Sequence, residues 1–135
     1  MESKLVFSHL TIKPGECIKL KGQVAPEAKS FALNLGRDES DLILHFNPRF
    51  EIHGDTKIIV CNSKACGVWG EELREPVFPF QQGEETKICV VFNDDEVTVK
   101  VNGDQEIKFP NRQGLDTARY LAVNGDIKIK SIKFD

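Results

Sequence analysis

This 135-residue chain has little of several features that would assign it to a common class. Its longest uncharged apolar run, residues 88–92, is far shorter than the roughly 20 residues of a membrane-spanning helix, so we expect no membrane insertion. The net charge is only −3 and Lys and Arg are scattered along the sequence, which argues against a nucleic-acid partner. The start, with an acid at position 2 and a brief apolar patch, does not look like a signal peptide.

Cysteine is also sparse, and Cys17, Cys61, Cys66 and Cys89 lack the dense spacing of a secreted disulfide scaffold. We favour free thiols in a reducing compartment over disulfides. The absence of any Asn-x-Ser/Thr sequon agrees with synthesis in the cytosol. Cys61 with His45 and His53 matches no standard ligand spacing, so we expect no metal and no other cofactor.

What the chain does have is a succession of short strand signals separated by turn residues, roughly every 8–12 residues. Asn102-Gly103 lies between residues 97–101 and 105–109 and predicts a hairpin, because Asn-Gly accepts positive φ angles. No segment has a long helical period, and residues 114–119 leave room for one short turn. The sequence predicts a single all-β domain over residues 1–135, built as an antiparallel two-sheet β-sandwich.

Apolar side chains stand at both ends of the chain, at Leu5, Val6, Ile129, Ile132 and Phe134. The apolar parity switches between Ile129 and Ile132, as a β-bulge would cause. These residues belong either to the sandwich core or to an exposed seam at a sheet edge that pairs two copies.

Residues 42–50 read Leu-Ile-Leu-His-Phe-Asn-Pro-Arg-Phe and alternate like a strand with one buried face. One parity holds the apolar residues Leu42, Leu44, Phe46 and Phe50, and the other holds His45, Asn47 and Arg49. Because alternate side chains of a strand point to opposite faces, the three polar groups should line up on one outer surface.

Further polar and aromatic residues follow shortly afterwards. Trp69 is the only tryptophan; its charged and glycine-rich neighbours favour a loop over the core position that a lone Trp usually takes. Glu72 and Arg74 share a parity and therefore point the same way. Either Arg74 and Arg49 together hold the Glu72 carboxylate in place, or Glu72 and Arg74 form an ordinary surface ion pair. Asn62 ends an apolar run, and its amide either meets a ligand or forms a turn.

His53 and Asp55 flank Gly54 in the turn predicted to join two strands. We expect both residues to be peripheral to the site, with Asp55 helping to anchor an arginine.

A hexose presents hydroxyls that donate and accept hydrogen bonds and a mildly apolar C–H face. Its site therefore needs directional polar groups beside a flat hydrophobic surface. His45, Asn47 and Arg49 supply the first, and Trp69 supplies the second. Three groups that converge on one oxygen can distinguish an axial from an equatorial 4-hydroxyl, hence galactose from glucose.

Sandwich folds also host glycoside hydrolases, which need two carboxylates across the scissile bond, one of them protonated. Glu72 is the only carboxylate well placed, and Glu71 has the opposite parity. Nearby arginines would favour the ionised form of Glu72, the wrong state for a general acid. We therefore expect no catalysis.

Taken together, these residues resemble the signature of the galectins, the β-galactoside-binding lectins. The resemblance covers the whole chain and is closest to prototype, single-domain members. Its main motifs are His45-Phe-Asn47-Pro48-Arg49, Val60-Cys-Asn62 and Trp69-Gly-Glu-Glu72-Leu-Arg74, with a further motif at Phe109-Pro-Asn-Arg112 that we interpret as structural.

The resemblance implies a jelly-roll-like, concanavalin-like lectin sandwich with the sugar in a groove on one face. It implies that His45, Asn47 and Arg49 bind the galactose 4-hydroxyl, and that Asn62 and Glu72 bind the 6-hydroxyl. It also implies that Trp69 stacks on the sugar ring, and that Arg49, Glu72 and Arg74 contact the adjoining glucose or N-acetylglucosamine.

Prototype galectins form two-fold dimers through their terminal strands, need reduced cysteines and leave the cell without a signal peptide. The resemblance therefore implies a homodimer, cytoplasmic and extracellular, that cross-links glycoproteins and glycolipids bearing β-galactosides. The alternative is an intracellular protein-interaction module whose sugar site is incidental.

Overall fold

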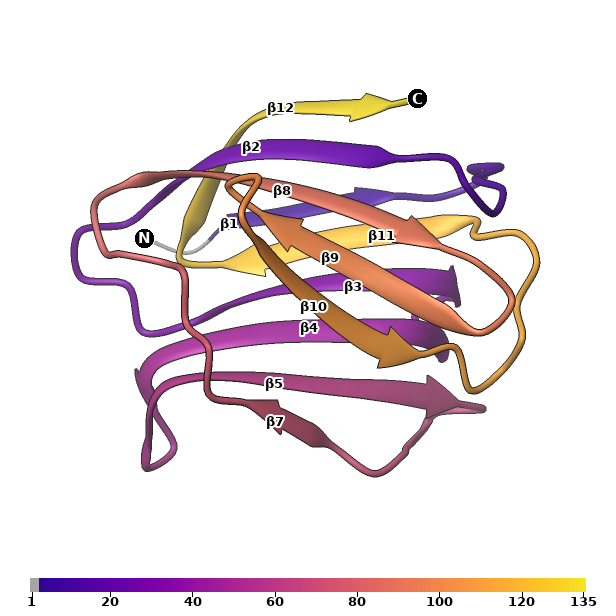
Figure 1. The fold of residues 1–135 in the computed structure, drawn as a ribbon, viewed down its shortest axis with the longest axis horizontal. Coiled ribbons are helices and arrows are strands. Elements are labelled where there is room, and N and C mark those ends of the chain that lie inside the picture. The colour runs from indigo at the N-terminus through magenta and orange to yellow at the C-terminus, as the bar shows by residue number, and fades with distance from the viewer. Residues whose placement is uncertain (1–2) are drawn as a thin grey trace.

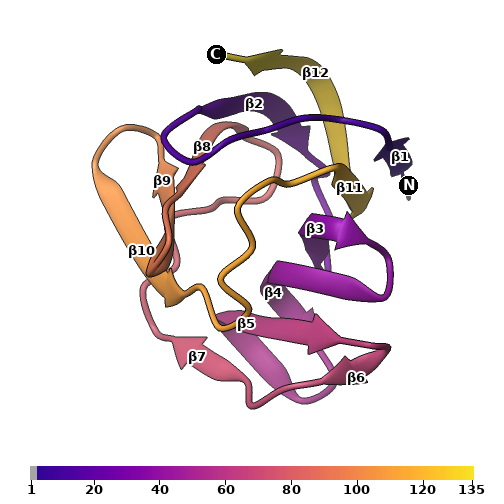
Figure 2. The same ribbon diagram turned by 90° about the vertical axis from the view of Figure 1, so that its right-hand side faces the viewer.

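The computed structural model describes residues 3–135, which form two antiparallel sheets packed face to face (Figure 1). Figure 2 looks nearly along the strands and shows the two layers separately. This confirms the predicted β-sandwich, and the described residues contain no turn of helix at 114–119. Among residues 3–135, no helix has the length and apolar composition needed to cross a membrane.

One sheet has seven strands and the other has five. The seven-stranded sheet runs in the order β1 (Ser3–Phe7), β11 (Tyr120–Gly125), β3 (Phe31–Asp38), β4 (Asp41–Ile52), β5 (Asp55–Ala65) and β6 (Val68–Trp69), and β7 (Leu73–Glu75) also pairs with β5. The five-stranded sheet runs in the order β10 (Gln105–Pro110), β9 (Glu96–Val101), β8 (Glu85–Phe92), β2 (Ile18–Val24) and β12 (Ile127–Phe134).

The core lies between the sheets and takes its side chains from alternate strand positions. In β2, for example, Ile18, Leu20 and Val24 are buried, whereas Lys19 is exposed. Phenylalanine fills most of the remaining volume, with Phe31, Phe46, Phe92 and Phe109 fully buried. Trp69 is excluded from this core, since 47% of its surface is exposed.

The turns follow the sequence closely. His53 and Gly54 form a two-residue connection between β4 and β5, with φ angles of 53° and 82°. Asn102 and Gly103 also have positive φ, as predicted, but the β9–β10 connection has three residues because Val101 pairs with Gln105. The side-chain oxygen of Asn102 accepts a hydrogen bond from the backbone N–H of Lys87, which ties this turn to β8.

The two terminal strands lie at the edges of different sheets on the same side of the molecule (Figure 2). The rings of Phe7 and Phe134 meet edge to face at 6.2 Å and join the two edges. The predicted bulge in β12 is present between Ile129 and Ser131. Leu5, Val6 and Phe134 are exposed, whereas Ile129 and Ile132 pack against the core.

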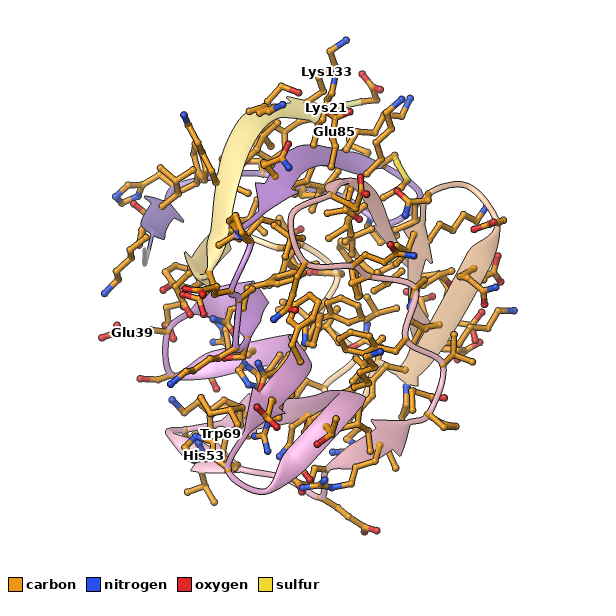
Figure 3. All side chains as sticks on the ribbon, turned by 90° about the vertical axis from the view of Figure 1, so that its left-hand side faces the viewer. Lys21, Glu39, His53, Trp69, Glu85 and Lys133 are labelled. Atoms are coloured by element: carbon orange, nitrogen blue, oxygen red, sulfur yellow. A yellow bond between two sulfur atoms is a disulfide. The ribbon has the colours of Figure 1, made fainter. Side chains whose placement is uncertain are left out.

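The expectation of four free thiols is wrong for two of them. Cys17 and Cys89 are joined by a disulfide, whose sulfur–sulfur bond is yellow in Figure 3. Cys17 immediately precedes β2, and the pairing of β2 with β8 places Cys89 opposite Lys19, so cysteines 72 residues apart become neighbours. Sequence spacing cannot show this, because it depends on strand order. Cys61 is buried and Cys66 is exposed, both as free thiols.

Candidate functional site

The site is built on the outward-facing side chains of β4. His45, Asn47 and Arg49 are half-buried and alternate with the buried residues Phe46 and Pro48. The inward side chains anchor the strand in the core, so the three polar groups share one outer face, as the alternation predicts.

The strand register then brings residues from later in the chain to this row. Asn62 pairs with His45 across β4 and β5. Arg74 of β7 lies across β5 from Asn47 of β4, because both residues pair with Val60 of β5. One edge of the groove is thereby formed by β5, β6 and β7.

His45 is held as a neutral acceptor. Its Nδ1 lies 2.6 Å from Oδ1 of Asn34, its partner across β3 and β4. Because an amide oxygen only accepts, Nδ1 carries the hydrogen and Nε2 keeps its lone pair. Burial, and then the charges of Arg49 and Lys64, lower the pKa of His45 to about 4, against a smaller opposite effect of Glu72. The imidazole is therefore uncharged at neutral pH.

A chain of charge-assisted hydrogen bonds fixes both arginines. Asp55 accepts from Nη1 of Arg49 at 2.6 Å and from Nη1 of Arg74 at 2.8 Å. Nε of Arg49 also donates to Oδ1 of Asn47 at 2.9 Å, and Nη2 of Arg74 donates to Glu72 at 2.9 Å. The hydrogen bonds from Arg74 and Arg49 lower the pKa of Asp55 below its ordinary value.

The sequence predicts that Arg49 and Arg74 hold the carboxylate of Glu72, and the structure differs in which carboxylate they share. The carboxylate that joins the two arginines is Asp55, assigned to the periphery from sequence, while Glu72 pairs with Arg74 alone among the described residues. The expectation that Asp55 anchors an arginine is confirmed. His53 is exposed in the turn and does not contribute to the network.

Asn62, Ser63, Gly70 and Arg112 form a second hydrogen-bonded unit. The Asn62 side chain is buried; its Nδ2 donates to the carbonyl of Gly70 at 3.0 Å, and its Oδ1 accepts from the backbone N–H of Ser63 at 2.7 Å. Nη1 of Arg112 donates to Oγ of Ser63 at 3.1 Å. A Cβ on Gly70 would come within 2.9 Å of that Arg112 nitrogen, so a larger residue here would require the Arg112 side chain to shift.

Trp69 forms the apolar wall. Its indole centroid lies 4.8 Å from the His45 ring, tilted by 58°, and the Lys64 ammonium lies 4.7 Å from the indole centroid. The cation restrains the ring through the negative face of its π-system and leaves much of the indole open to solvent.

These groups enclose a depression of about 410 Å³ lined by His45, Arg49, Val60, Asn62, Trp69, Gly70 and Glu72. Asn47 and Arg74 lie beside it and hold the lining residues in place. A larger depression of about 610 Å³ lies near Pro26 and Ile127. Of its two carboxylates, Glu27 and Asp126, the second already accepts hydrogen bonds from two backbone amides, and the lining has no aromatic side chain, so this depression does not suit a sugar.

The sequence missed three supporting residues. Asn34 orients His45, Lys64 contacts Trp69, and Arg112 ties the Asn62 unit to the loop after β10. The only sequence signal for any of them is the Phe109–Arg112 motif, for which the sequence predicts a structural role. The other two contacts depend on the pairing of β3 with β4 and of β5 with β6.

Comparison with known proteins agrees with this architecture. The profile of the family described as galactoside-binding lectin matches residues 5–134. The chain is 52% identical over 135 residues to galectin-1 of Mus musculus, covering 100% of both. Its fold matches CG-16, a homodimeric agglutinin from chicken liver, with a TM-score of 0.96 and 53% identity over 98% of this chain and 100% of that one.

A toad ovary galectin solved in complex with thio-digalactose superposes with a TM-score of 0.94 and 41% identity, covering 98% of each chain. The chain belongs to the galactoside-binding lectin family, the galectins.

Proposed function

We propose that the depression beside Trp69 binds the galactose of β-galactosides, and that the protein acts as a lectin without catalysis. The observation that carries this proposal is the pairing of a neutral acceptor, His45, with the fixed donors of Arg49 in one depression. A hydroxyl that donates to His45 Nε2 and accepts from Arg49 satisfies both protein groups at once.

This arrangement would read the direction of one hydroxyl. The axial 4-hydroxyl of galactose stands out from the ring and reaches a row of side chains on one strand, while the C–H face of the same sugar lies on Trp69. An equatorial 4-hydroxyl leaves the half-buried groups of His45 and Arg49 unpaired, which costs roughly 1–3 kcal/mol per group. Glucose is thereby rejected.

The remaining contacts extend the site. In this proposal Asn62 and Glu72 bind the 6-hydroxyl, and Arg49, Glu72 and Arg74 reach the adjoining sugar. Most of these groups already have protein partners, so the site is preorganised and little side-chain entropy is lost on binding.

The carboxylates support binding rather than bond cleavage. Glu72 is the carboxylate that lines the depression, and its Oε1 accepts two hydrogen bonds from Arg74, at 3.1 and 2.9 Å. A glycosidase needs a second carboxylate across the scissile bond, one of the pair being protonated. Asp55, which shares Arg74 with Glu72, is held in its ionised form because hydrogen bonds from Arg74 and Arg49 lower its pKa.

Cross-linking would follow from pairing of two copies. Leu5, Val6 and Phe134 are exposed apolar residues on the two terminal edge strands, whose backbone groups are free to pair with another chain. A homodimer carries two sites, and two weak sites gain avidity on clustered glycoproteins or glycolipids without any new contact. The proposed places of action are the cytoplasm and the extracellular space, as in the galectins generally.

Calorimetric titration with lactose, and with cellobiose as the equatorial control, tests the sugar assignment. We expect heat with lactose alone. Trp69→Ala should weaken lactose binding at least about tenfold, since stacking and its buried area are both lost. Val68→Ala removes an exposed apolar side chain from the same strand and should leave the affinity unchanged. The absence of binding heat with both sugars would overturn the proposal.

Two further measurements test the remaining parts. Sustained release of galactose from a lactoside, lost on Glu72→Gln, would contradict the absence of catalysis. Sedimentation at micromolar concentrations should give a dimer that Val6→Asp dissociates. A monomer in the unaltered protein would remove the cross-linking role and leave sugar binding intact.

A further inference from the structure

The outer face of the five-stranded sheet carries a cluster of lysines that sugar binding does not use. Lys19 and Lys21 come from β2, Lys87 from β8, Lys100 from β9 and Lys133 from β12. The sequence had shown only scattered basic residues. Strand pairing gathers these five on one surface of a chain whose net charge is −3.

The register makes this cluster unusual. Lys19 lies directly opposite Lys133, and Lys21 lies directly opposite Lys87. Like charges at directly opposed positions of a sheet destabilise it. Carboxylates relieve the repulsion only in part: Lys19 pairs with Asp135 at 3.0 Å, Lys21 with Glu85 at 3.8 Å and Lys100 with Glu106 at 4.0 Å. Among residues 3–135, neither Lys87 nor Lys133 has a carboxylate within 4.0 Å.

These lysines line a shallow depression of about 390 Å³. Leu20, Ile88, Cys89, Gly103 and Ser131 complete its lining, and the lysine stems supply apolar surface beneath the charged ammonium groups. Neighbouring strands are about 4.8 Å apart and alternate residues about 6.8 Å apart. The ammonium groups therefore form a grid that can contact several anionic groups in succession.

We propose that this lysine face is a second binding site, which takes a sulfated polysaccharide chain. Every basic residue in its lining is a lysine and none is an arginine. Lysine binds tetrahedral oxyanions as a point charge with freely rotating donors, whereas the planar arginine fork binds carboxylates and phosphates through two parallel hydrogen bonds. A repeating chain of sulfate groups matches a grid of such charges better than an acidic peptide does.

Two other polyanions fit the face less well. Single-stranded nucleic acids need aromatic side chains on which bases stack, and the lining has none. An anionic membrane surface is held by apolar residues as well as charge, and none of the described exposed large hydrophobic residues lines this depression.

The lysine face is separate from the galactoside groove. In Figure 3, Lys21 and Lys133 lie together at one end of the molecule with Glu85 beside them, and Trp69 lies at the other end. The two sites lie on different sheets, so one protomer can hold a β-galactoside and a sulfated chain at the same time.

Binding of the full chain to immobilised heparin, in saturating lactose, tests the proposal. We expect salt-dependent binding that lactose does not displace. The double variant Lys87→Gln/Lys133→Gln should lower heparin affinity about tenfold or more and reduce the slope of log affinity against log salt by about 2. Lys13→Gln/Lys57→Gln removes the same charge from exposed positions elsewhere and should change heparin affinity less than about twofold.

Lactose titration of each variant verifies folding independently, because the galactoside groove is unaltered. Desulfated heparin should bind at least about tenfold more weakly than heparin. The proposal is overturned if desulfated heparin binds equally well, if the Lys87/Lys133 double variant keeps its affinity, or if lactose displaces heparin. Tighter binding to polyadenylate or to phosphatidylserine vesicles would reassign the face to those ligands and equally overturn it.

Discussion

The protonation state of His45 gives the sharpest test of the proposed binding mechanism. Burial and two nearby cations lower the pKa of this imidazole from 6.5 to about 4. The shift corresponds to about 3 kcal/mol in favour of the neutral form, at 1.36 kcal/mol per pKa unit. If the neutral Nε2 accepts from a sugar hydroxyl, the affinity for lactose should follow the neutral fraction of His45.

The expected pH dependence is then quantitative. With a pKa of about 4, only about a tenth of His45 is protonated at pH 5, so lactose affinity should change by less than about 1.5-fold between pH 7.5 and pH 5. With the ordinary pKa of 6.5, the same change of pH would weaken binding about 30-fold. The two cases are easily distinguished by titration calorimetry.

Proton NMR of the imidazole ring measures the same quantity directly, with the His45 signal assigned by its loss in His45→Gln. The midpoint should lie near pH 4 and move lower in saturating lactose. Lys64→Gln should raise it, because the Lys64 charge opposes protonation, whereas Lys57→Gln should not. A midpoint near 6.5, or a tenfold loss of lactose affinity by pH 5, would refute the reasoning.

The same shift affects stability. Because the native pKa lies below the unfolded value, the unfolded chain binds more protons between pH 6.5 and about 4. Stability therefore falls as the pH falls through this window, and His45 accounts for at most about 3 kcal/mol of the loss. In urea unfolding experiments, His45→Gln should flatten this part of the stability profile.

Three other predictions concern separate features. Asp55→Asn should weaken lactose binding at least about tenfold by releasing Arg49, measured by calorimetry, and an unchanged affinity would remove Asp55 from the site. Iodoacetamide should modify the exposed Cys66 well before Cys61, whose pKa is raised to about 12 by burial and then by Glu75; mass spectrometry of timed samples checks the order. Gly125→Ala should destabilise the fold by about 2 kcal/mol or more in urea, because φ is 102° and a Cβ would lie 2.6 Å from Cα of Phe31.

Local patterns predict much of this fold. The alternation in residues 42–50 correctly placed His45 and Arg49 on one face, and the turn residues marked two hairpins. The pairing of Cys17 with Cys89 could not be foreseen, because it depends on which distant strands become neighbours. The same limit hid the lysine face, whose members are scattered in sequence and meet only across β2, β8, β9 and β12.

The candidate site was predictable in its residues and less so in its connections. His45, Trp69 and Glu72 were identified from residue type and parity, and the structure brings all three to one depression. The hub position of Asp55 was not foreseen, because Asp55 and Arg74 are 19 positions apart and meet only through the β4–β5 turn and the pairing of β7 with β5. Hydrogen-bond partners of this kind require the register, which the sequence does not contain.

The strand order also constrains how the protein is made. The five-stranded sheet pairs β2 with β12, and the seven-stranded sheet pairs β1 with β11, so early and late segments meet in both layers. Neither sheet can be completed on the ribosome until residues 120–134 have emerged from the exit tunnel. During that interval the apolar inner faces are exposed to other chains, and non-local pairing of this kind folds slowly. A nascent chain stalled before residue 120 should therefore bind chaperones and show no affinity for lactose.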